Sequence, residues 1–344
     1  MHEYLSWMAA HTATKWCNDS ADLNDLRRAF DAGAVGCTTN PPLSYLALTA
    51  SPDAFAAERA ALTAAGDERV AELIGIVVRP IARLLTPVFD RSAGDQGYVR
   101  AQVQPGLADD AEAMIAMGRL FASWAPNVMV KIPGTAAGVI ALEELAAAGI
   151  PTTPTVNTTI SQIVAVAEAN ERGIARARAA GIAPAPSTAA IVLGRLQDYL
   201  AAVSTERDAG VPVYDLECAC IAFVKRAYRI FRDRGYAQAL MPAAFRCARQ
   251  VSELVGSDVV MTIHPSIQEV VATADATGAI ERDPDAIEGE IDHDAVERVC
   301  AALPEFVEAY EPDALDPAHF RSYGATAMTL ASFDATGWQK LRTL

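Results

Sequence analysis

A lysine inside an apolar run is the residue of this sequence best suited to covalent chemistry. The stretch is NVMVKIPGTAAG, residues 127–138, in which Lys131 lies between Val130 and Ile132. The chain has four lysines against 24 arginines, so a general need for positive charge does not explain it. Desolvation lowers the pKa of a lysine, and the neutral amine can form a Schiff base with a carbonyl. The alternative is a strand-end lysine that reaches solvent or pairs with Asp19.

Schiff-base cleavage of a carbon–carbon bond needs further groups around the lysine. A base must take a hydroxyl proton, a polar pair must hold water during dehydration of the carbinolamine, and donors must bind the sugar hydroxyls. Asp19 could be the base, Gln102 with Thr155 could hold the water, and Asn40 could bind a hydroxyl.

The order of β-type and helical stretches predicts how these side chains are brought together. Short β-type runs alternate with alanine-rich helical segments, which is typical of parallel βα units. No G-x-G-x-x-G follows the first run, so a (β/α)8 TIM barrel fits better than an open doubly wound sheet. The eight predicted strands are 12–19, 34–42, 98–105, 127–138, 151–156, 189–195, 238–246 and 259–265.

The predicted chain is one domain, 1–344, with the barrel at about 12–270 and a helical extension at about 271–344. Chemistry in such a barrel is concentrated at the C-terminal ends of the strands. His264 at the last strand end could contact substrate or carry a proton, or it could simply bond a neighbouring backbone group. The polar residues expected at this mouth are Asp19, Thr38, Thr39, Asn40, Gln102, Gln104, Lys131, Thr153, Thr155, Arg195, Arg246 and His264.

The amino-acid composition of the chain excludes some classes of binding partner. The formal net charge of −15 repels nucleic acid and anionic membranes, although a few arginines can still converge on a small anion. No apolar run is long enough to span a membrane, and the N-terminus lacks the pattern of a secretory signal, so we expect a cytoplasmic protein. Aromatic residues gathered between 306 and 338 indicate either core packing or the surface of a homodimer.

Several stretches occur in the order found in a known family, over roughly residues 15 to 270. The sequence resembles the transaldolases and the related fructose-6-phosphate aldolases. The most specific combination is T-T-N-P after the second strand with K-I-P-G-T-x-x-G at the fourth. The matching stretches are DSADLNDL, GCTTNPPL, AQV, VMVKIPGTAAGVIALEELAAAGIPTTPT, VLGRLQDY and AAFR.

The resemblance implies a class I transaldolase of carbohydrate metabolism, acting in the pentose phosphate pathway without a metal or organic cofactor. Lys131 resembles the family's Schiff-base lysine and Asp19 its general acid/base. Asn40 resembles the contact to a sugar hydroxyl, and Thr155 the threonine that holds the catalytic water. Arg195 and Arg246 resemble the arginines that bind the substrate phosphate, with Thr38, Thr153 and His264 as further expected substrate contacts.

Departures from the family pattern keep other activities open. Gln102 replaces the glutamate of transaldolases, and glutamine cannot shuttle a proton. The free-standing aldolases also have glutamine there, but Val192 stands where they have tyrosine and transaldolases have phenylalanine. Ala190 and Ala244 remove two hydroxyls from the phosphate site, and Thr153 replaces an asparagine. The alternatives are an aldolase that releases dihydroxyacetone to water, or a barrel that binds a ligand without turnover.

Overall fold

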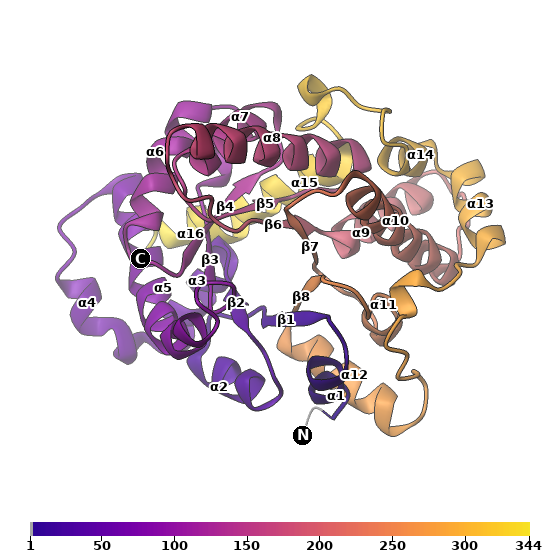
Figure 1. Cartoon of the computed structure of the whole chain (residues 1–344), viewed down its shortest axis with the longest axis horizontal. Coiled ribbons are helices and arrows are strands. Elements are labelled where there is room, and N and C mark those ends of the chain that lie inside the picture. The colour runs from indigo at the N-terminus through magenta and orange to yellow at the C-terminus, as the bar shows by residue number, and fades with distance from the viewer. Residues whose placement is uncertain (1–2) are drawn as a thin grey trace.

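A computed structural model describes residues 3–344 of the chain. Residues 1 and 2, which belong to the predicted domain 1–344, lie outside the described part. Eight short strands alternate with helices along the chain (Figure 1). The strands are β1 Lys15–Asn18, β2 Gly36–Thr38, β3 Val99–Gln102, β4 Val128–Pro133, β5 Thr152–Thr155, β6 Thr188–Ile191, β7 Ala239–Pro242 and β8 Val260–Ile263.

All strand pairs are parallel, and together they close a ring. Six strands follow one another in the order β5-β4-β3-β2-β1-β8, and β6 pairs with β7. Isolated bridges at Thr152–Ser187 and Asn157–Ile191 connect β5 to β6. Bridges at Leu240–Val259 and Ala243–Thr262 connect β7 to β8. The predicted (β/α)8 barrel is therefore confirmed.

Helices surround the strands, and most of the buried apolar side chains form one core that includes the strand–helix interface (Figure 1). Polar side chains at the strand-to-helix turns cap several of them, satisfying backbone N–H groups that have no partner in the first turn. The helices that follow the strands are α2 Leu23–Asp31, α3 Pro41–Ala50, α4 Ala56–Ala60, α5 Gly66–Arg91, α6 Ala111–Ala122, α7 Ala136–Ala147, α8 Ile160–Ala179, α9 Leu193–Glu206, α10 Val213–Arg234, α11 Ala248–Ser252 and α12 Pro265–Ala276.

Further helices lie before and after the barrel segment. The N-terminal helix is α1 Glu3–His11, and the C-terminal ones are α13 His293–Ala302, α14 Pro304–Tyr310, α15 Gly324–Phe333 and α16 Gln339–Leu341. A π-helical turn, η5 Asp334–Trp338, continues α15 and packs on α3. Leu330 and Phe333 of α15 are buried against Ala108 and Val156, which follow β3 and β5. The end of the chain thus covers part of the barrel mouth.

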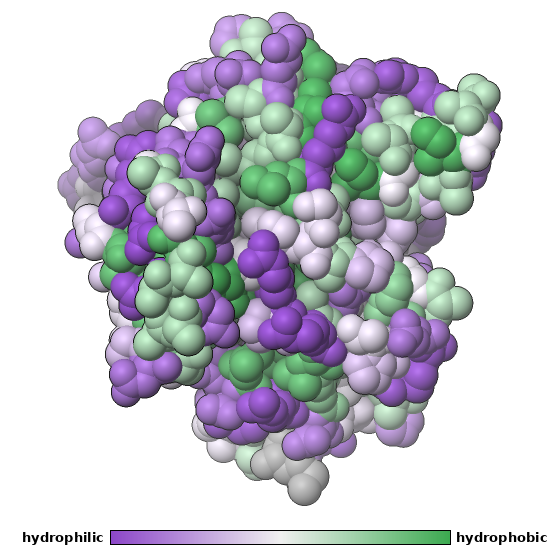
Figure 2. Space-filling model, turned by 90° about the vertical axis from the view of Figure 1, so that its left-hand side faces the viewer, coloured by the Kyte–Doolittle hydropathy of each residue, from purple (hydrophilic) through white to green (hydrophobic). Residues whose placement is uncertain are grey.

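The surface mixes polar and apolar side chains. Leu46 on α3, Leu120 on α6 and Ile140 on α7 are exposed on three different helices. The face in Figure 2 likewise alternates hydrophilic and hydrophobic residues. Within residues 3–344, none of the helices combines the length and apolar character needed to cross a membrane.

Candidate functional site

Lys131 lies on β4 in the barrel, with only 7% of its surface exposed. Its Nζ donates a hydrogen bond to the backbone oxygen of Thr39 at 3.1 Å. Burial lowers the pKa of Lys131 to about 8, while Asp19 raises it and the cation of Arg100 lowers it further. About one amine in ten is then neutral at pH 7, against roughly one in three thousand at the ordinary pKa. The amine is available as a nucleophile.

Gln102 is the register partner of Lys131 on the neighbouring strand β3. Its amide is 1% exposed, and within residues 3–344 neither its nitrogen nor its oxygen has a hydrogen-bond partner. Buried polar groups without partners are rare in folded proteins, and each one calls for a ligand, a water or a catalytic explanation. An amide beside the lysine can donate to and accept from a reacting oxygen.

Thr153 and Thr155 lie on β5, on the other side of Lys131. Thr153 is in register with Lys131, and its hydroxyl already bonds to Thr188 at 3.2 Å. Thr155 is buried one step nearer the mouth, and the following residue, Val156, has a φ of +59°. A left-handed conformation is strained for a β-branched residue and occurs mostly at functional turns. It lets the chain turn away directly after Thr155.

Asp19 follows β1 immediately and is held by a relay of hydroxyls. The hydroxyl of Thr38 donates to the carboxylate of Asp19 at 2.6 Å and contacts the hydroxyl of Thr262 at 2.5 Å. Because Thr38 has a single proton and gives it to Asp19, the proton between the two threonines must come from Thr262. Three strands, β1, β2 and β8, therefore fix one carboxylate at the mouth.

A cavity of about 390 Å³ opens above these groups. Asp19 and Asn40 line it, whereas Lys131, Gln102 and Thr155 do not and lie buried. Asn40 is the N-cap of α3, and its side-chain oxygen accepts from the N–H of Leu43. Among residues 3–344 the amide nitrogen of Asn40 has no hydrogen-bond acceptor, and such a donor suits a sugar hydroxyl.

Arg195 and Arg246 line the same cavity, although neither lies in a strand as the sequence predicted. Arg195 lies in the first turn of α9, and Arg246 lies in the loop between β7 and α11. The predicted strands 189–195 and 238–246 are too long, because the register between β6 and β7 ends at Ile191 and Pro242 and the last backbone bonds to neighbouring strands are made by Val192 and Ala243. Apolar side chains continue past the strand ends, so periodicity could not locate them.

A close backbone approach brings the two arginines together. A side chain at Gly194 would meet the backbone oxygen of Ala244 at 1.7 Å, so only glycine fits there. Ala244 itself has a φ of +64°. The two arginines differ in their counter-charge, because Arg246 forms a bidentate ion pair with Asp198 at 2.5 and 2.9 Å. Arg195 has no carboxylate partner among residues 3–344, and burial and Arg246 lower its pKa.

The remaining predicted residue, His264, is the N-cap of α12 and lines the cavity. Its Nδ1 accepts from the backbone N–H of Ser266 at 3.2 Å and lies 2.8 Å from the hydroxyl of the same residue. The imidazole therefore makes the local backbone contact that was the alternative to a substrate role, and among residues 3–344 its Nε2 makes no hydrogen bond.

Sequence analysis missed four residues that shape the site. Thr262 supports Thr38, Asp198 neutralises Arg246, and the ring of Phe333 lies 5.4 Å from the guanidinium carbon of Arg195. Arg100 lies in the barrel beneath Lys131. A polar residue in an apolar strand was the available signal for Arg100 and Thr262, whereas Asp198 and Phe333 looked like ordinary helix residues.

Comparison with known proteins identifies the family of the chain. A family model described as Transaldolase/Fructose-6-phosphate aldolase matches residues 16–316. The chain belongs to this family. The match includes every strand from Trp16 onward and the residues that line the cavity except Phe333 and Thr336, and it extends into the C-terminal helices as far as residue 316.

Individual members of the transaldolase family share moderate identity with the chain. A protein named Transaldolase from Thiobacillus denitrificans is 33% identical over 228 residues, which are 63% of this chain and 62% of that protein. Transaldolase 1 of Streptomyces avermitilis is 38% identical over 154 residues, 43% of this chain and 40% of the relative. A Transaldolase from Acidothermus cellulolyticus is 28% identical over 278 residues, 77% and 73% of the two chains. The first two matches thus span less than two thirds of the relatives' lengths.

Proposed function

We propose that this protein is a class I transaldolase that transfers a dihydroxyacetone unit from a ketose phosphate to an aldose phosphate. The observation that carries the proposal is a buried lysine with a pKa near 8 beside the unpartnered amide of Gln102. Desolvation supplies the neutral amine that attack on a ketone requires. Asp19 supplies a carboxylate at the same mouth, from a third strand.

The first half-reaction begins when Nζ of Lys131 attacks C2 of the ketose and forms a carbinolamine. The C2 oxygen leaves as water, with Gln102 and Thr155 binding it, and an iminium remains. Asp19 accepts the proton of the C4 hydroxyl, the C3–C4 bond breaks, and its electron pair flows into the iminium. An aldose phosphate is released, and a three-carbon enamine stays on Lys131.

The second half-reaction reverses these steps with another aldehyde. C3 of the enamine adds to the aldehyde carbon, Asp19 returns its proton to the new hydroxyl, and water hydrolyses the iminium to free Lys131. The lysine itself is the electron sink in both directions. Arg195 is the cation that we assign to the substrate phosphate, because Arg246 is already neutralised by Asp198.

A second candidate is an aldolase that gives the dihydroxyacetone unit to water. Gln102 favours it, since an amide can hold water but cannot move a proton as a glutamate does. Both candidates share the enamine on Lys131, and they differ in whether an aldehyde acceptor or hydrolysis removes it.

Reductive trapping tests the shared chemistry. Fructose 6-phosphate, and separately dihydroxyacetone, would be incubated with the protein and reduced with borohydride before intact-mass spectrometry. We expect a dihydroxyacetone-sized adduct on the wild type and on Lys15→Ala, a control at the opposite end of the barrel, but none on Lys131→Ala. If the wild type carries no adduct with either donor, the barrel binds without turnover or takes a different ketose, and the proposal fails.

The fate of the trapped unit separates the two activities. Product formation from fructose 6-phosphate would be measured with and without erythrose 4-phosphate as acceptor. A transaldolase turns over at an appreciable rate only when the acceptor is present. Equal turnover in its absence, with free dihydroxyacetone accumulating, would assign the aldolase activity instead.

A further inference from the structure

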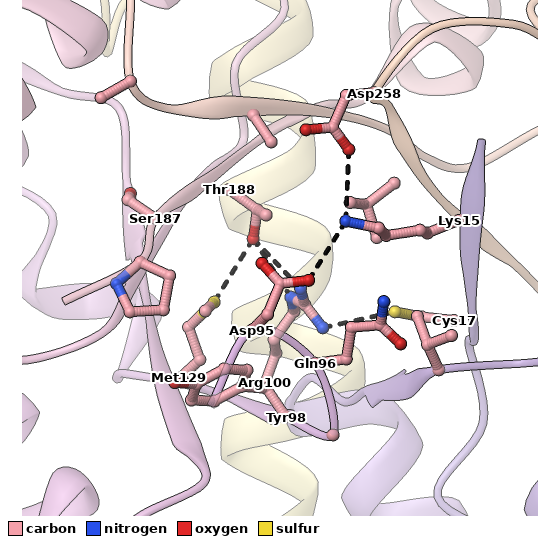
Figure 3. Close-up of a pocket in the computed structure, with 16 residues that line it drawn as sticks. Lys15, Cys17, Asp95, Gln96, Tyr98, Arg100, Met129, Ser187, Thr188 and Asp258 are labelled. Carbon is pink, nitrogen blue, oxygen red and sulfur yellow. Dashed lines mark hydrogen bonds and ion pairs between the residues drawn. The ribbon is translucent and has the colours of Figure 1, made fainter. Parts of the chain in front are cut away.

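A second cavity lies at the N-terminal end of the barrel, opposite the mouth that holds Asp19. Its volume is about 140 Å³, the space of four or five water molecules at about 30 Å³ each. It is lined by the starts of the strands and the turns before them, and Figure 3 shows its principal side chains. Nothing in the proposed reaction uses this end of the barrel.

Arg100 is the dominant group on the wall of this cavity. Its side chain leaves β3 toward the barrel interior and is only 4% exposed. Its Nε and Nη2 donate to the hydroxyl of Thr188 at 3.3 and 3.2 Å, and its Nη1 lies 3.3 Å from the thiol of Cys17. Within residues 3–344 the guanidinium has no carboxylate partner.

A buried cation with only neutral partners is energetically unfavourable. Buried charges are normally paired, because transfer of an unpaired ion from water into the interior is expensive. The guanidinium has five N–H donors, and a hydroxyl and a thiol satisfy only part of this capacity. Among residues 3–344 the guanidinium therefore has no carboxylate at ion-pair distance, although Asp95 and Asp258 line the same cavity and pair with Lys15.

A glycine leaves room for the guanidinium of Arg100. Gly36, at the start of β2, faces the guanidinium, and a Cβ there would lie 3.3 Å from Nη1 of Arg100 and 2.9 Å from the backbone oxygen of Tyr98. Any larger residue would displace the arginine or the strand. Glycine at this position therefore allows the guanidinium of Arg100 to occupy its place in the barrel interior.

Lys15 lies at the rim of the same cavity. Its Nζ lies 3.2 Å from Asp95 and 3.3 Å from Asp258, and Figure 3 shows it between the two carboxylates. The carboxylates are 62% and 73% exposed, so these ion pairs are screened by solvent and weak. Lys15 can exchange a carboxylate for an anion that enters beside it.

We propose that this basal cavity binds a small anion, a carboxylate or oxyanion of up to about five heavy atoms, through the guanidinium of Arg100 with Lys15 at the rim. Guanidinium matches the planar oxygen pair of such anions by bidentate hydrogen bonding. The size of the cavity excludes sugar phosphates, so the ligand class differs from that of the mouth.

An anion bound at this site would also change the pKa of Lys131, the lysine of the proposed reaction. Arg100 lowers the pKa of Lys131 through its charge. A bound anion cancels that charge and raises the pKa of Lys131, which reduces the neutral fraction of the amine. This consequence rests on the proposed function, whereas binding of the anion does not.

Nitrate is the probe in the binding test, and its binding is measured by isothermal titration calorimetry at low ionic strength. Wild type, Arg100→Met and Arg195→Gln would be compared, because Arg195 at the mouth could also hold nitrate. We expect one saturable basal site in the wild type and in Arg195→Gln, and binding at least about tenfold weaker in Arg100→Met. Methionine is of similar bulk and apolar, so this variant should fold.

Rim variants test the same proposal without touching the core. Asp95→Asn and Asp258→Asn remove acidic charge at the rim and should tighten nitrate binding severalfold, whereas Lys15→Met should weaken it. Asp53→Asn, an exposed aspartate on η1 Pro52–Phe55, is the matched control and should change nothing. Equal nitrate affinity in Arg100→Met and wild type, or equal effects of Asp53→Asn and the rim variants, would overturn the site. If adducts still form on Lys131, the proposed function stands regardless.

Discussion

Gln102 and Lys131 are register partners on β3 and β4, so their side chains leave adjacent strands on the same side. Lys131 bonds to the oxygen of Thr39, whereas the amide of Gln102 is buried without a partner. The pair combines a desolvated nucleophile with an unused donor and acceptor. The predictions below separate the contribution of each group to rate, stability and substrate choice.

The rate should follow the ionisation of Lys131. Because attack requires the neutral amine, kcat/KM for fructose 6-phosphate should rise with pH and level off above an apparent pKa of about 8. The measurement is kcat/KM between pH 6 and 9.5 at constant ionic strength. A profile that is flat from pH 7 to 9, or still rising tenfold per pH unit at 9.5, would disagree with the desolvated lysine.

Removing the lysine should stabilise the fold while abolishing activity. Between pH 8 and 10.5 the unfolded chain holds a proton on Lys131 that the native state lacks, so wild-type stability rises with pH across this window. Below pH 8 the buried ammonium carries its full desolvation penalty. Lys131→Met should therefore raise the free energy of unfolding by about 1–3 kcal/mol at pH 7, and less at pH 10. Urea unfolding of both proteins at the two pH values, with Lys340→Met as surface control, checks this.

Gln102→Leu should have opposite effects on the stability of the protein and on the rate at which the carbinolamine loses water. The leucine removes two buried, unpartnered polar atoms and should stabilise the protein by about 1–2 kcal/mol. Loss of the water-binding amide should lower kcat about 10²-fold. Thermal unfolding and steady-state kinetics provide the two readouts. A destabilised variant with normal kcat would mean that Gln102 is only a packing residue.

Arg195 should contribute more to phosphate recognition than Arg246. Arg195→Gln should raise KM for fructose 6-phosphate about 10- to 100-fold, because the charge of Arg195 has no counter-ion among residues 3–344. Arg246→Gln should have a smaller effect, since it also frees Asp198. Unphosphorylated fructose should react equally with all variants, and Arg172→Gln on α8 serves as the surface control. Identical KM values for the phosphorylated substrate would show that it binds elsewhere.

Thr38 should act by holding the carboxylate of Asp19. Thr38→Val removes its donor and should lower kcat about tenfold while KM stays the same, since one hydrogen bond is worth about 1 kcal/mol. Thr38→Ser keeps the hydroxyl and should restore the rate. If serine and valine behave alike, the hydroxyl does not position Asp19.

The barrel could be predicted because the alternation of β-type runs and helical segments can be recognised within short stretches of the sequence. The site was partly predictable for the same reason, since polar residues at strand ends must meet at one mouth. The helical location of Arg195 and the loop location of Arg246 were not, because a strand ends where pairing to neighbouring strands ends. Asp198 and Phe333 escaped notice because their importance comes from contacts with residues 48 and 138 positions away. The predicted domain boundaries and homodimer stay predictions.

The sequence by itself determined the barrel, the family resemblance and the choice of Lys131 as the proposed Schiff-base lysine, because these depend on residue order and on patterns within single elements. Tertiary structure decided the chemical state of each group. The pKa of Lys131 depends on burial and on the charges of Asp19 and Arg100. The amide of Gln102 has no hydrogen-bond partner among residues 3–344, and Arg246, in a loop, is paired with Asp198 of α9. Desolvation and charge pairing depend on distances in space, and these are set only when the whole ring of strands closes.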